Sequence, residues 1–298
     1  MRSLTALGIS FCLLGGCIGT ASALTIPVTA ANGAPEQIPA ILSRPDGPGP
    51  FPAIVILHDC SGLGPRSSGR PAAWAKELAG QGYVVLIPDS FTTRGHADGV
   101  CTDPSPHSRA EVGPYRRVHD AYGALGYLRT LPYVDGRRVG LMGGSHGGST
   151  TLAAMAEPET DTEPLAQEKR AGFAAAVALY PGCATRLGNW HCDCTGVYRA
   201  VAPLLILIGE KDDWTPAEPC RKLTEAAHEA GYPVTIKVYP GARHAFDSDR
   251  PVRYIAARVN RNSPGGRGAT TGGDPKAWVD SVRQVVTFFG QHLVEAEK

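Results

Sequence analysis

Three residues with the side chains of a nucleophile, an acid and a base follow one another along the chain. Ser145 is the centre of Gly-Gly-Ser-His-Gly, Asp212 lies in Gly-Glu-Lys-Asp-Asp-Trp, and His244 follows Pro-Gly-Ala-Arg. A serine hydroxyl becomes a good nucleophile when a histidine accepts its proton and a carboxylate holds that histidine in the required tautomer. The order serine, aspartate, histidine therefore predicts a catalytic triad for acyl transfer.

The pentapeptide around Ser145 is typical of a sharp turn from a strand into a helix, with the serine at its apex. The glycines at positions 143 and 147 leave room for the strand and the helix to approach each other. The motif alone is weak, because the chain has 36 glycines and chance matches are expected. An idle serine in a glycine-rich turn is the alternative, and the ordered acid and base favour the triad.

The predicted acid lies in a loop that follows the apolar run 204–208. Asp212 comes three residues after Gly209, which ends the expected strand, and Pro216 follows four residues later. The adjacent Asp213 is the alternative acid. A solvated turn is a further interpretation, but it does not explain why the loop follows so apolar a strand.

A tetrahedral intermediate of acyl transfer needs hydrogen-bond donors for its negatively charged oxygen. We expect one donor to be the backbone N–H of His146, directly after the serine. The second is expected from the loop 58–62, with the N–H of Cys60 as the candidate. Asp59 in this loop is also a candidate substrate-binding residue, although stabilisation of the turn is the ordinary interpretation of its side chain and of His58.

Short apolar runs precede each of the three predicted catalytic residues. They lie at 139–142, 204–208 and 234–239 and are expected to be buried strands. Strands and helices alternate after residue 50, which favours a mainly parallel sheet with helices on both faces. Ligands bind such sheets beyond the carboxyl ends of the strands, where the three residues are expected to lie.

The remaining segments are assigned from apolar periodicity and from glycine and proline boundaries. Further strands are expected at 26–29, 38–42, 53–57, 83–87 and 173–180. Helices are expected at 70–81, 115–131, 149–155, 217–230 and 276–294. Residues 91–114, 157–169, 181–198 and 260–274 are expected to be loops, and no domain linker or internal repeat is predicted.

The composition is that of a globular protein with a sizeable core. Hydrophobic residues make up 43% of the 298 residues and charged residues 19%. A formal net charge of +1 argues against a nucleic-acid partner, because nucleic acid selects strongly basic surfaces.

The N-terminal segment has the pattern of a secretion signal. Arg2 gives it a positive start, residues 4–18 are apolar, and Ala-Ser-Ala at 21–23 is a cleavage site. We therefore assign 1–23 to a signal peptide and 24–298 to a single mature domain, periplasmic or secreted, without a membrane span. A lipoprotein signal that leaves a lipid anchor on Cys17 is the alternative.

Six cysteines remain outside the predicted signal. An even number in an oxidising compartment suggests disulfides. Cys60–Cys101 is the first choice, because both residues are expected in loops at the carboxyl ends of neighbouring strands. Cys183–Cys220 or Cys183–Cys192 is the next.

Together these motifs resemble the dienelactone hydrolase family of α/β-hydrolases. The resemblance implies the α/β-hydrolase fold, with a mainly parallel central sheet of about eight strands and helices on both faces. It also implies a single catalytic domain that uses no metal and no cofactor. The stretches that carry it run through nearly the whole mature chain: HDCSGL at 58–63, DSFTTRG at 89–95, GLMGGSHGG at 140–148, LYPGC at 179–183, GEKDDWTP at 209–216 and YPGARHAF at 239–246.

Two features depart from the name-giving enzymes of that family, which use a cysteine nucleophile and an arginine close behind the catalytic histidine to bind a substrate carboxylate. Here Ser145 holds the nucleophile's position, and Asp247 and Ser248 follow Phe246. Arg94 is a candidate for the missing arginine's role. We therefore predict an exported serine esterase for small-molecule esters or lactones, with a dienelactone-type lactone hydrolase proper as the alternative.

Three aromatic residues near the predicted site are candidates for substrate contact. Phe91, Trp214 and Phe246 are expected to wall an apolar acyl or alcohol pocket. Each is equally compatible with ordinary packing. The loops that shape the pocket have no readable signature, and the sequence gives no oligomeric state.

Three other functions fit parts of the sequence. A zinc module would use the ligand types in Cys183, His191, Cys192, Asp193 and Cys194, but the C-x-C spacing lacks a matching second pair. A non-catalytic, hydrolase-like binding protein would be expected to have a broken triad. A peptidase related to prolyl oligopeptidases would be expected to carry an extra domain that selects peptides.

Overall fold

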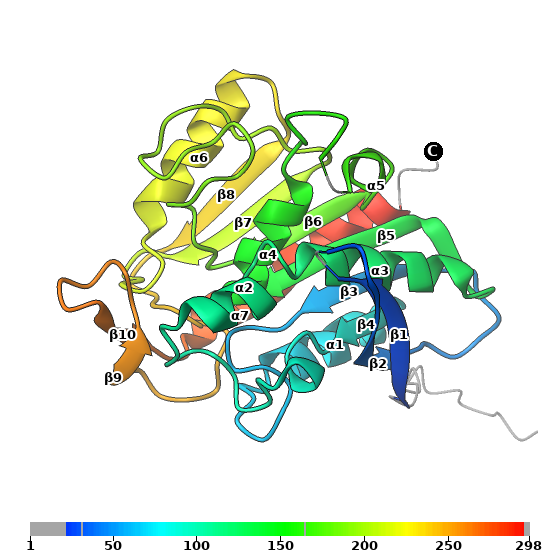
Figure 1. Cartoon of the computed structure of the whole chain (residues 1–298), viewed down its shortest axis with the longest axis horizontal. Coiled ribbons are helices and arrows are strands. Elements are labelled where there is room, and N and C mark those ends of the chain that lie inside the picture. The colour runs from blue at the N-terminus through cyan, green and yellow to red at the C-terminus, as the bar shows by residue number, and fades with distance from the viewer. Residues whose placement is uncertain (1–21, 31, 164, 295–298) are drawn as a thin grey trace, which may run out of the picture.

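Eight strands form one central sheet, and several of them are runs of valine, isoleucine and leucine that are buried along most of their length. The computed structural model describes residues 22–30, 32–163 and 165–294. The strands are β1 (Ser22–Thr29), β2 (Pro35–Ser43), β3 (Phe51–Leu57), β4 (Val84–Pro88), β5 (Val134–Gly144), β6 (Ala175–Leu179), β7 (Leu204–Gly209) and β8 (Val234–Tyr239). Their order across the sheet is β1-β2-β4-β3-β5-β6-β7-β8 (Figure 1). The predicted sheet of about eight strands is confirmed.

Across the sheet from β4 to β8 neighbouring strands are parallel, and β2 runs opposite to both of its neighbours, β1 and β4. The register aligns their carboxyl ends, because Leu57 pairs with Gly143, and Gly209 pairs with Tyr239. The loops that follow β3, β5, β7 and β8 therefore meet at one edge of the sheet.

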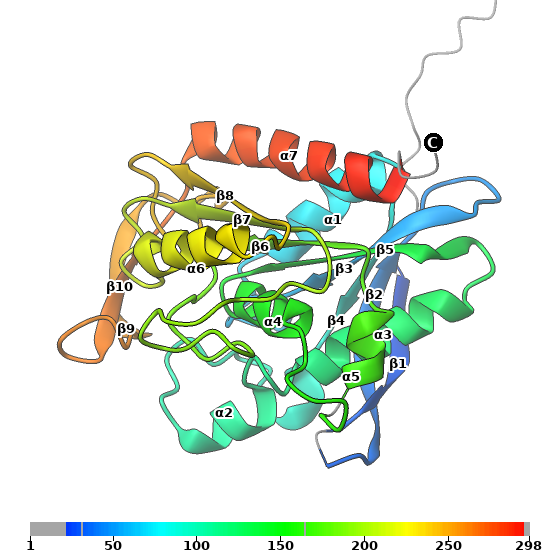
Figure 2. The ribbon, with the colours of Figure 1, turned by 90° about the horizontal axis from the view of Figure 1, so that it is seen from above.

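Helices cover both faces of the sheet, as expected for a parallel sheet buried on both sides. They are α1 (Arg70–Gly80), α2 (Pro106–Val112), α3 (Val118–Thr130), α4 (His146–Met155), α5 (Ala166–Arg170), α6 (Ala217–Glu229) and α7 (Pro275–Phe289), with short turns η1 (Thr92–Arg94) and η2 (Gly290–Val294). Figure 2 shows α1 and α7 on one face and α3, α4 and α6 on the other.

Three segments predicted as loops contain regular structure, and α5 begins at Ala166 inside the one at 157–169. The segment 91–114 includes α2, where Pro106 begins the helix and Ser105 caps it by accepting a hydrogen bond from the N–H of Ser108. The segment 260–274 includes β10 (Arg267–Thr271), which pairs with β9 (Arg253–Val259) in a separate hairpin. Glycine in and around β10 weakens the sequence signal for the strand, and hydrogen bonds from Thr270 to the distant Asp213 help to hold it.

Most of the predicted signal peptide lies outside the described residues. This holds for residues 1–21 and therefore for Cys17. Strand β1 begins at Ser22, which pairs with Leu42. The strand therefore starts two residues before Leu24, the predicted N-terminus of the mature chain. Among the described residues, no helix combines the length and the apolar character needed to cross a bilayer.

Candidate active site

Ser145 lies in a tight turn between β5 and α4, as its motif predicts. Its φ of 54° and ψ of −113° form a conformation that non-glycine residues rarely adopt. A Cβ on Gly143 would lie 2.3 Å from the carbonyl oxygen of Gly147, and a Cβ on Gly147 would lie 2.1 Å from that of Leu57. The two glycines are therefore required by close backbone approach, and the turn holds the serine at the carboxyl edge of the sheet.

The structure joins the three predicted catalytic side chains in one chain of hydrogen bonds. His244 Nε2 lies 2.9 Å from the Ser145 hydroxyl, and His244 Nδ1 lies 2.8 Å from Asp212 Oδ2. His244 and Asp212 are both buried. Asp213, the alternative acid, instead accepts hydrogen bonds from the N–H and the hydroxyl of Thr270 on β10.

Residues around Asp212 and His244 fix their orientation. The second carboxylate oxygen of Asp212 accepts the N–H groups of Trp214 and Thr215 at 2.9 and 2.8 Å. The Thr215 hydroxyl lies 3.0 Å from Asp212 Oδ2 and 3.0 Å from the carbonyl oxygen of Tyr180. The rings of Trp214 and Tyr180 each lie 4.7 Å from the His244 ring. The histidine is thus held between two aromatic rings and a fully engaged carboxylate.

A buried polar group lies behind Tyr180. Its hydroxyl donates to Asp247 at 2.9 Å, and the indole N–H of Trp74 donates to the same carboxylate at 2.8 Å. Burial raises the pKa of Asp247 and raises that of Tyr180 well above its ordinary value. Asp247 thus anchors Tyr180, whose ring contacts His244. This role of Asp247 and Tyr180 was not predicted from the sequence.

The two predicted oxyanion donors, Cys60 and His146, line the same cavity as Ser145. Within 22–30, 32–163 and 165–294, neither backbone N–H has a hydrogen-bond acceptor. His58 is fully buried, with Nδ1 donating to the Asp59 carbonyl at 2.8 Å and Nε2 accepting from the Ser90 N–H at 3.2 Å. Burial lowers the pKa of His58 well below its ordinary value, so this histidine is neutral and ties the loop to the end of β4.

Asp59 has the role that the ordinary interpretation gave it. Its carboxylate accepts hydrogen bonds from the N–H of Ser61 at 2.7 Å and from the hydroxyls of Ser61 and Ser68. It also lines the smaller of two cavities beside Ser145. Its oxygens are therefore engaged within the loop that carries Cys60.

Two cavities open beside Ser145. The larger has a volume of about 460 Å³ and contains His146 in its wall. Its apolar lining includes Val100, Pro114, Tyr115, Leu187, Trp214 and Pro219. The smaller has a volume of about 80 Å³ and contains His244 in its wall. Five arginines line it, namely Arg66, Arg70, Arg250, Arg253 and Arg258.

Three predicted substrate contacts are wrong. Phe91 and Phe246 are fully buried and line neither cavity. Phe91 packs 4.5 Å from the His58 ring, and Phe246 packs 5.5 Å from the Tyr180 ring, so both support the site from behind.

Arg94 lies away from the cavities because Glu36 and Asp120 pair with it. Its guanidinium lies 2.8 Å from one carboxylate and 2.7 Å from the other. Of the five candidates for substrate contact, Trp214 lines both cavities and Asp59 lines the smaller one.

Both disulfides lie at the site: Cys60–Cys101 was the first choice from the sequence, and Cys183–Cys220 was one of the two alternatives left open for Cys183. Cys60 is bonded to Cys101 and Cys183 to Cys220, which leaves Cys192 and Cys194 as free thiols. The first bond ties the predicted oxyanion loop to the segment before α2, and Val100 donates to the Cys60 carbonyl at 2.7 Å. The second ties the cysteine-rich loop to α6.

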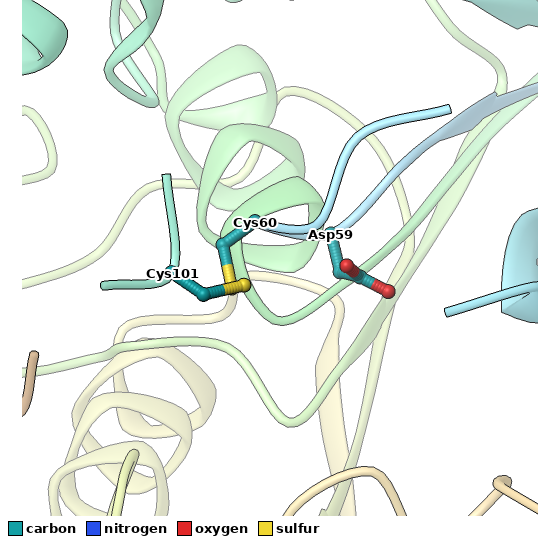
Figure 3. A group of neighbouring side chains, drawn as sticks. All are labelled: Asp59, Cys60 and Cys101. Atoms are coloured by element: carbon teal, nitrogen blue, oxygen red, sulfur yellow. A yellow bond between two sulfur atoms is a disulfide. The ribbon is translucent and has the colours of Figure 1, made fainter. Parts of the chain in front are cut away.

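These bonds also determine which cysteines of the described residues are available as metal ligands. There, the one cluster of three close metal-ligand types is Asp59 with Cys60 and Cys101 (Figure 3). The two sulfurs are bonded to each other, so no thiolate is available to a metal. The zinc alternative loses Cys183 in the same way.

Loss of the Cys183–Cys220 bond is expected to lower the free energy of unfolding. The bond closes a loop of 37 residues, for which chain entropy predicts about 4 kcal/mol and measured cases give about 2–4 kcal/mol. The measurement is urea unfolding of the double variant Cys183→Ala, Cys220→Ala. The control is Cys192→Ser at an exposed free thiol. Equal midpoints for the wild type and the double variant would contradict the expectation.

Sequence reasoning missed Thr215, Tyr180 and Arg117. Thr215 follows the acid in Asp-Asp-Trp-Thr-Pro, and a threonine there is an ordinary signal for a turn. Arg117 is fully buried, and its Nη1 lies 2.8 Å from His146 Nδ1. No sequence pattern marks an arginine just before an amphipathic helix as buried.

Comparison with known proteins places the chain in a family of hydrolases. The family model described as "Dienelactone hydrolase family" matches residues 38–293. A "Putative carboxymethylenebutenolidase" of Methylorubrum extorquens is 26% identical over 74% of this chain and 71% of the relative. A "Probable 2-oxo-3-(5-oxofuran-2-ylidene)propanoate lactonase" of Bradyrhizobium sp. is 24% identical over 74% of this chain and 86% of the relative.

The fold is also that of solved structures. The crystal structure of a "Putative Dienelactone Hydrolase" from Klebsiella pneumoniae superposes with a TM-score of 0.62 at 20% identity, covering 91% of this chain and 99% of the other. At this identity the likeness concerns the fold. The family model matches most of the chain, and the fold agrees with it. The chain therefore belongs to the dienelactone hydrolase family.

Proposed function

We propose that this protein is an exported serine hydrolase that cleaves carboxylic ester or lactone bonds through Ser145, His244 and Asp212. Membership of the dienelactone hydrolase family makes it a carboxylic ester hydrolase. The observation that carries the finer proposal is the hydrogen-bond chain from Asp212 through His244 to Ser145, with 2.8 and 2.9 Å between the joined atoms. This geometry is what proton transfer from the serine hydroxyl requires.

The reaction proceeds through an acyl-enzyme. Ser145 Oγ bonds to the ester carbonyl carbon while its proton passes to His244 Nε2. The tetrahedral intermediate collapses, the C–O bond to the alcohol breaks, and His244 returns the proton to the departing oxygen. Water then attacks the acyl-enzyme with His244 as the base, and the acid and the free serine are released. Asp212 stabilises the imidazolium in both halves.

The negatively charged oxygen of each tetrahedral intermediate is held by the N–H groups of Cys60 and His146. Both residues border the larger cavity beside Ser145, and their N–H groups have no other acceptor in the described part of the chain. Preorganised donors of this kind contribute about 3–4 kcal/mol each to lowering the barrier.

Export is supported by two separate features. Residues 1–23 have the pattern of a cleaved signal peptide, and two disulfides join cysteines of the described chain. Structural disulfides persist in oxidising compartments such as the periplasm. The mature protein is a single domain with the site at the carboxyl edge of its sheet.

The linings of the two cavities support one orientation of the substrate at Ser145. The leaving alcohol must lie near His244, which protonates it, and His244 lines the smaller cavity but not the larger. The acyl group then occupies the larger, mainly apolar cavity. Arginines around the smaller cavity favour an alcohol portion, or a lactone substituent, that carries negative charge. The names of the two relatives, a carboxymethylenebutenolidase and a lactonase, accord with ester or lactone substrates.

Hydrolysis of p-nitrophenyl esters of increasing acyl length tests this proposal. A cavity of about 460 Å³ is large enough for a drug-sized group. Each methylene that it buries contributes about 0.8 kcal/mol, or roughly fourfold. We therefore expect kcat/KM to rise by about tenfold from the acetate to the butanoate. A steady fall from the acetate onward would contradict the acyl assignment, and hydrolysis that is independent of Ser145 would contradict the mechanism.

A further inference from the structure

A buried guanidinium lies directly behind the residue that follows Ser145. Arg117 is fully buried at the start of α3. Its Nη1 donates to His146 Nδ1 at 2.8 Å, and its guanidinium carbon lies 5.1 Å from the centre of the Phe91 ring. His146 in turn packs 5.7 Å from Phe91. The hydrogen bond leaves the His146 proton on Nε2 and fixes the ring against α4.

No carboxylate pairs directly with this cation among the described residues, although the charges of Asp120, Asp59 and Asp89 favour its charged form. No carboxylate oxygen lies within 4.0 Å of it, and its Nε and Nη2 atoms have no hydrogen-bond partner there. The neighbouring Arg94 and Arg116 differ, because both pair with Glu36 and Asp120.

The nearby carboxylates are all engaged elsewhere. Asp120 binds Arg94 and Arg116, and Asp89 accepts from the Phe91 N–H and the Thr92 hydroxyl. Asp59 is held by serines of its own loop. An unpaired buried charge opposes folding, and an apolar side chain of similar volume is often better for stability. The position of Arg117 therefore needs an explanation other than stability.

Arg117 reaches the predicted oxyanion site through the side chain of His146, whose backbone N–H is one of the two predicted donors. Burial, together with the Arg117 charge, lowers the pKa of His146 and of His58 well below the ordinary value, so both imidazoles are neutral. Burial also lowers the pKa of Arg117, to about 10, which leaves it charged at neutral pH. A fixed positive charge in a medium of low dielectric acts strongly on charge that forms nearby.

We propose that Arg117 is a positioning residue for the oxyanion site: through His146 it fixes the N–H that receives the oxyanion, and its unpaired charge favours the anionic tetrahedral state over the neutral ester. This inference rests on the proposed serine mechanism. It predicts that Arg117 stabilises the tetrahedral intermediate and does not affect binding of the neutral ester, because only the intermediate carries the negatively charged oxygen.

Arg117→Met removes the charge and keeps a chain of similar length. We expect kcat to fall by about 10–100-fold, KM to change by less than about twofold, and affinity for an alkyl boronic acid to fall by the same factor as kcat. A boronic acid bonded to Ser145 is a tetrahedral anion, so it reports the same charge. The midpoint of urea unfolding is expected to stay or to rise.

Arg116→Met is the matched control, because it removes an adjacent arginine that is paired with Glu36 and Asp120. It is expected to lower the unfolding midpoint and to leave kcat and boronic acid affinity near the wild type. Arg117→Lys returns a charge and is expected to recover part of kcat. On a His146→Ala background, Arg117→Met is expected to add less than about threefold, because the interaction through His146 is already lost.

The outcomes separate this inference from the proposed function. Unchanged kcat, or unchanged boronic acid affinity, in Arg117→Met overturns the role of Arg117 while wild-type hydrolysis that requires Ser145 keeps the proposed function. Failure of Arg117→Met to fold, with full kcat in Arg117→Lys and Arg117→Gln, would make the residue structural and would also overturn the inference. No hydrolysis and no boronic acid adduct in the wild type would overturn both.

Discussion

Ser145→Ala is expected to lower kcat for ester hydrolysis by about 10⁴–10⁶-fold while the fold is retained. The change removes the atom that forms the acyl-enzyme, and loss of a triad nucleophile has effects of this size. Stability is expected to change by less than about 0.5 kcal/mol. Among the residues that the structure describes, the hydroxyl bonds only to His244, and alanine keeps the Cβ that the positive φ already accommodates. The measurements are kcat with a p-nitrophenyl ester and the urea midpoint.

Ser149→Ala is the matched control for this variant. Ser149 lies one turn further along α4 and lines the same cavity, but its hydroxyl bonds to backbone groups of Ser145 and Gly182. We expect its kcat to stay within about fivefold of the wild type. Full activity in Ser145→Ala would exclude the serine mechanism, and equal losses in both variants would point to a general disturbance of the cavity.

The positions of the three proposed triad residues could be predicted because each depends on local sequence. Ser145, Asp212 and His244 directly follow apolar runs between glycine turns, and parallel strands bring their carboxyl ends to one edge. The Cys60–Cys101 bond follows from the same reasoning, whereas the sequence left Cys192 and Cys220 as alternative partners of Cys183. Chain order and strand ends together are enough to place these groups.

The walls of the site could not be predicted, because burial at a loop depends on distant partners. Phe91 and Phe246 have the residue type of a pocket wall, but they pack against His58 and Tyr180 beneath the site. Arg94 is withdrawn from the site by Glu36, which is 58 positions away in the sequence. Sequence shows the type of each side chain and not the direction in which it points.

The β9–β10 hairpin was missed for a related reason. Its second strand has a glycine at 268 and a shift of register after Arg267, so its own propensity for a strand is weak. Tertiary contacts supply the rest: Trp214 Nε1 donates to the Val259 carbonyl at 2.8 Å, and Asp213 accepts from Thr270. The hairpin thus packs on the acid loop. The two adjacent aspartates have different partners, because Asp213 bonds to Thr270 of the hairpin and Asp212 bonds to His244.

Asp212→Asn is expected to lower kcat by about 10⁴-fold, with a smaller effect on KM. One Asp212 oxygen accepts two backbone N–H groups, which fixes how the side chain lies, so the amide nitrogen of asparagine would face His244. His244 Nδ1 would then accept a hydrogen bond and Nε2 would carry the proton. In that tautomer His244 cannot take the proton of Ser145, and the imidazolium loses its counter-charge. Steady-state kinetics on the same ester measures the loss.

Asp213→Asn is the control for that substitution, because the two aspartates are adjacent and change in the same way. Asp213 bonds to Thr270 at 2.8 Å through the backbone N–H and at 2.6 Å through the hydroxyl, and it makes no contact with His244. We expect kcat within about fivefold of the wild type and a small loss of stability, since the asparagine oxygen still accepts one bond. The reverse ranking would place the acid at 213. Loss of activity in both variants would mean that the bond from Asp213 to Thr270 of β10 sets the position of the acid loop, and the proposed triad would then depend on a hairpin that the sequence did not predict.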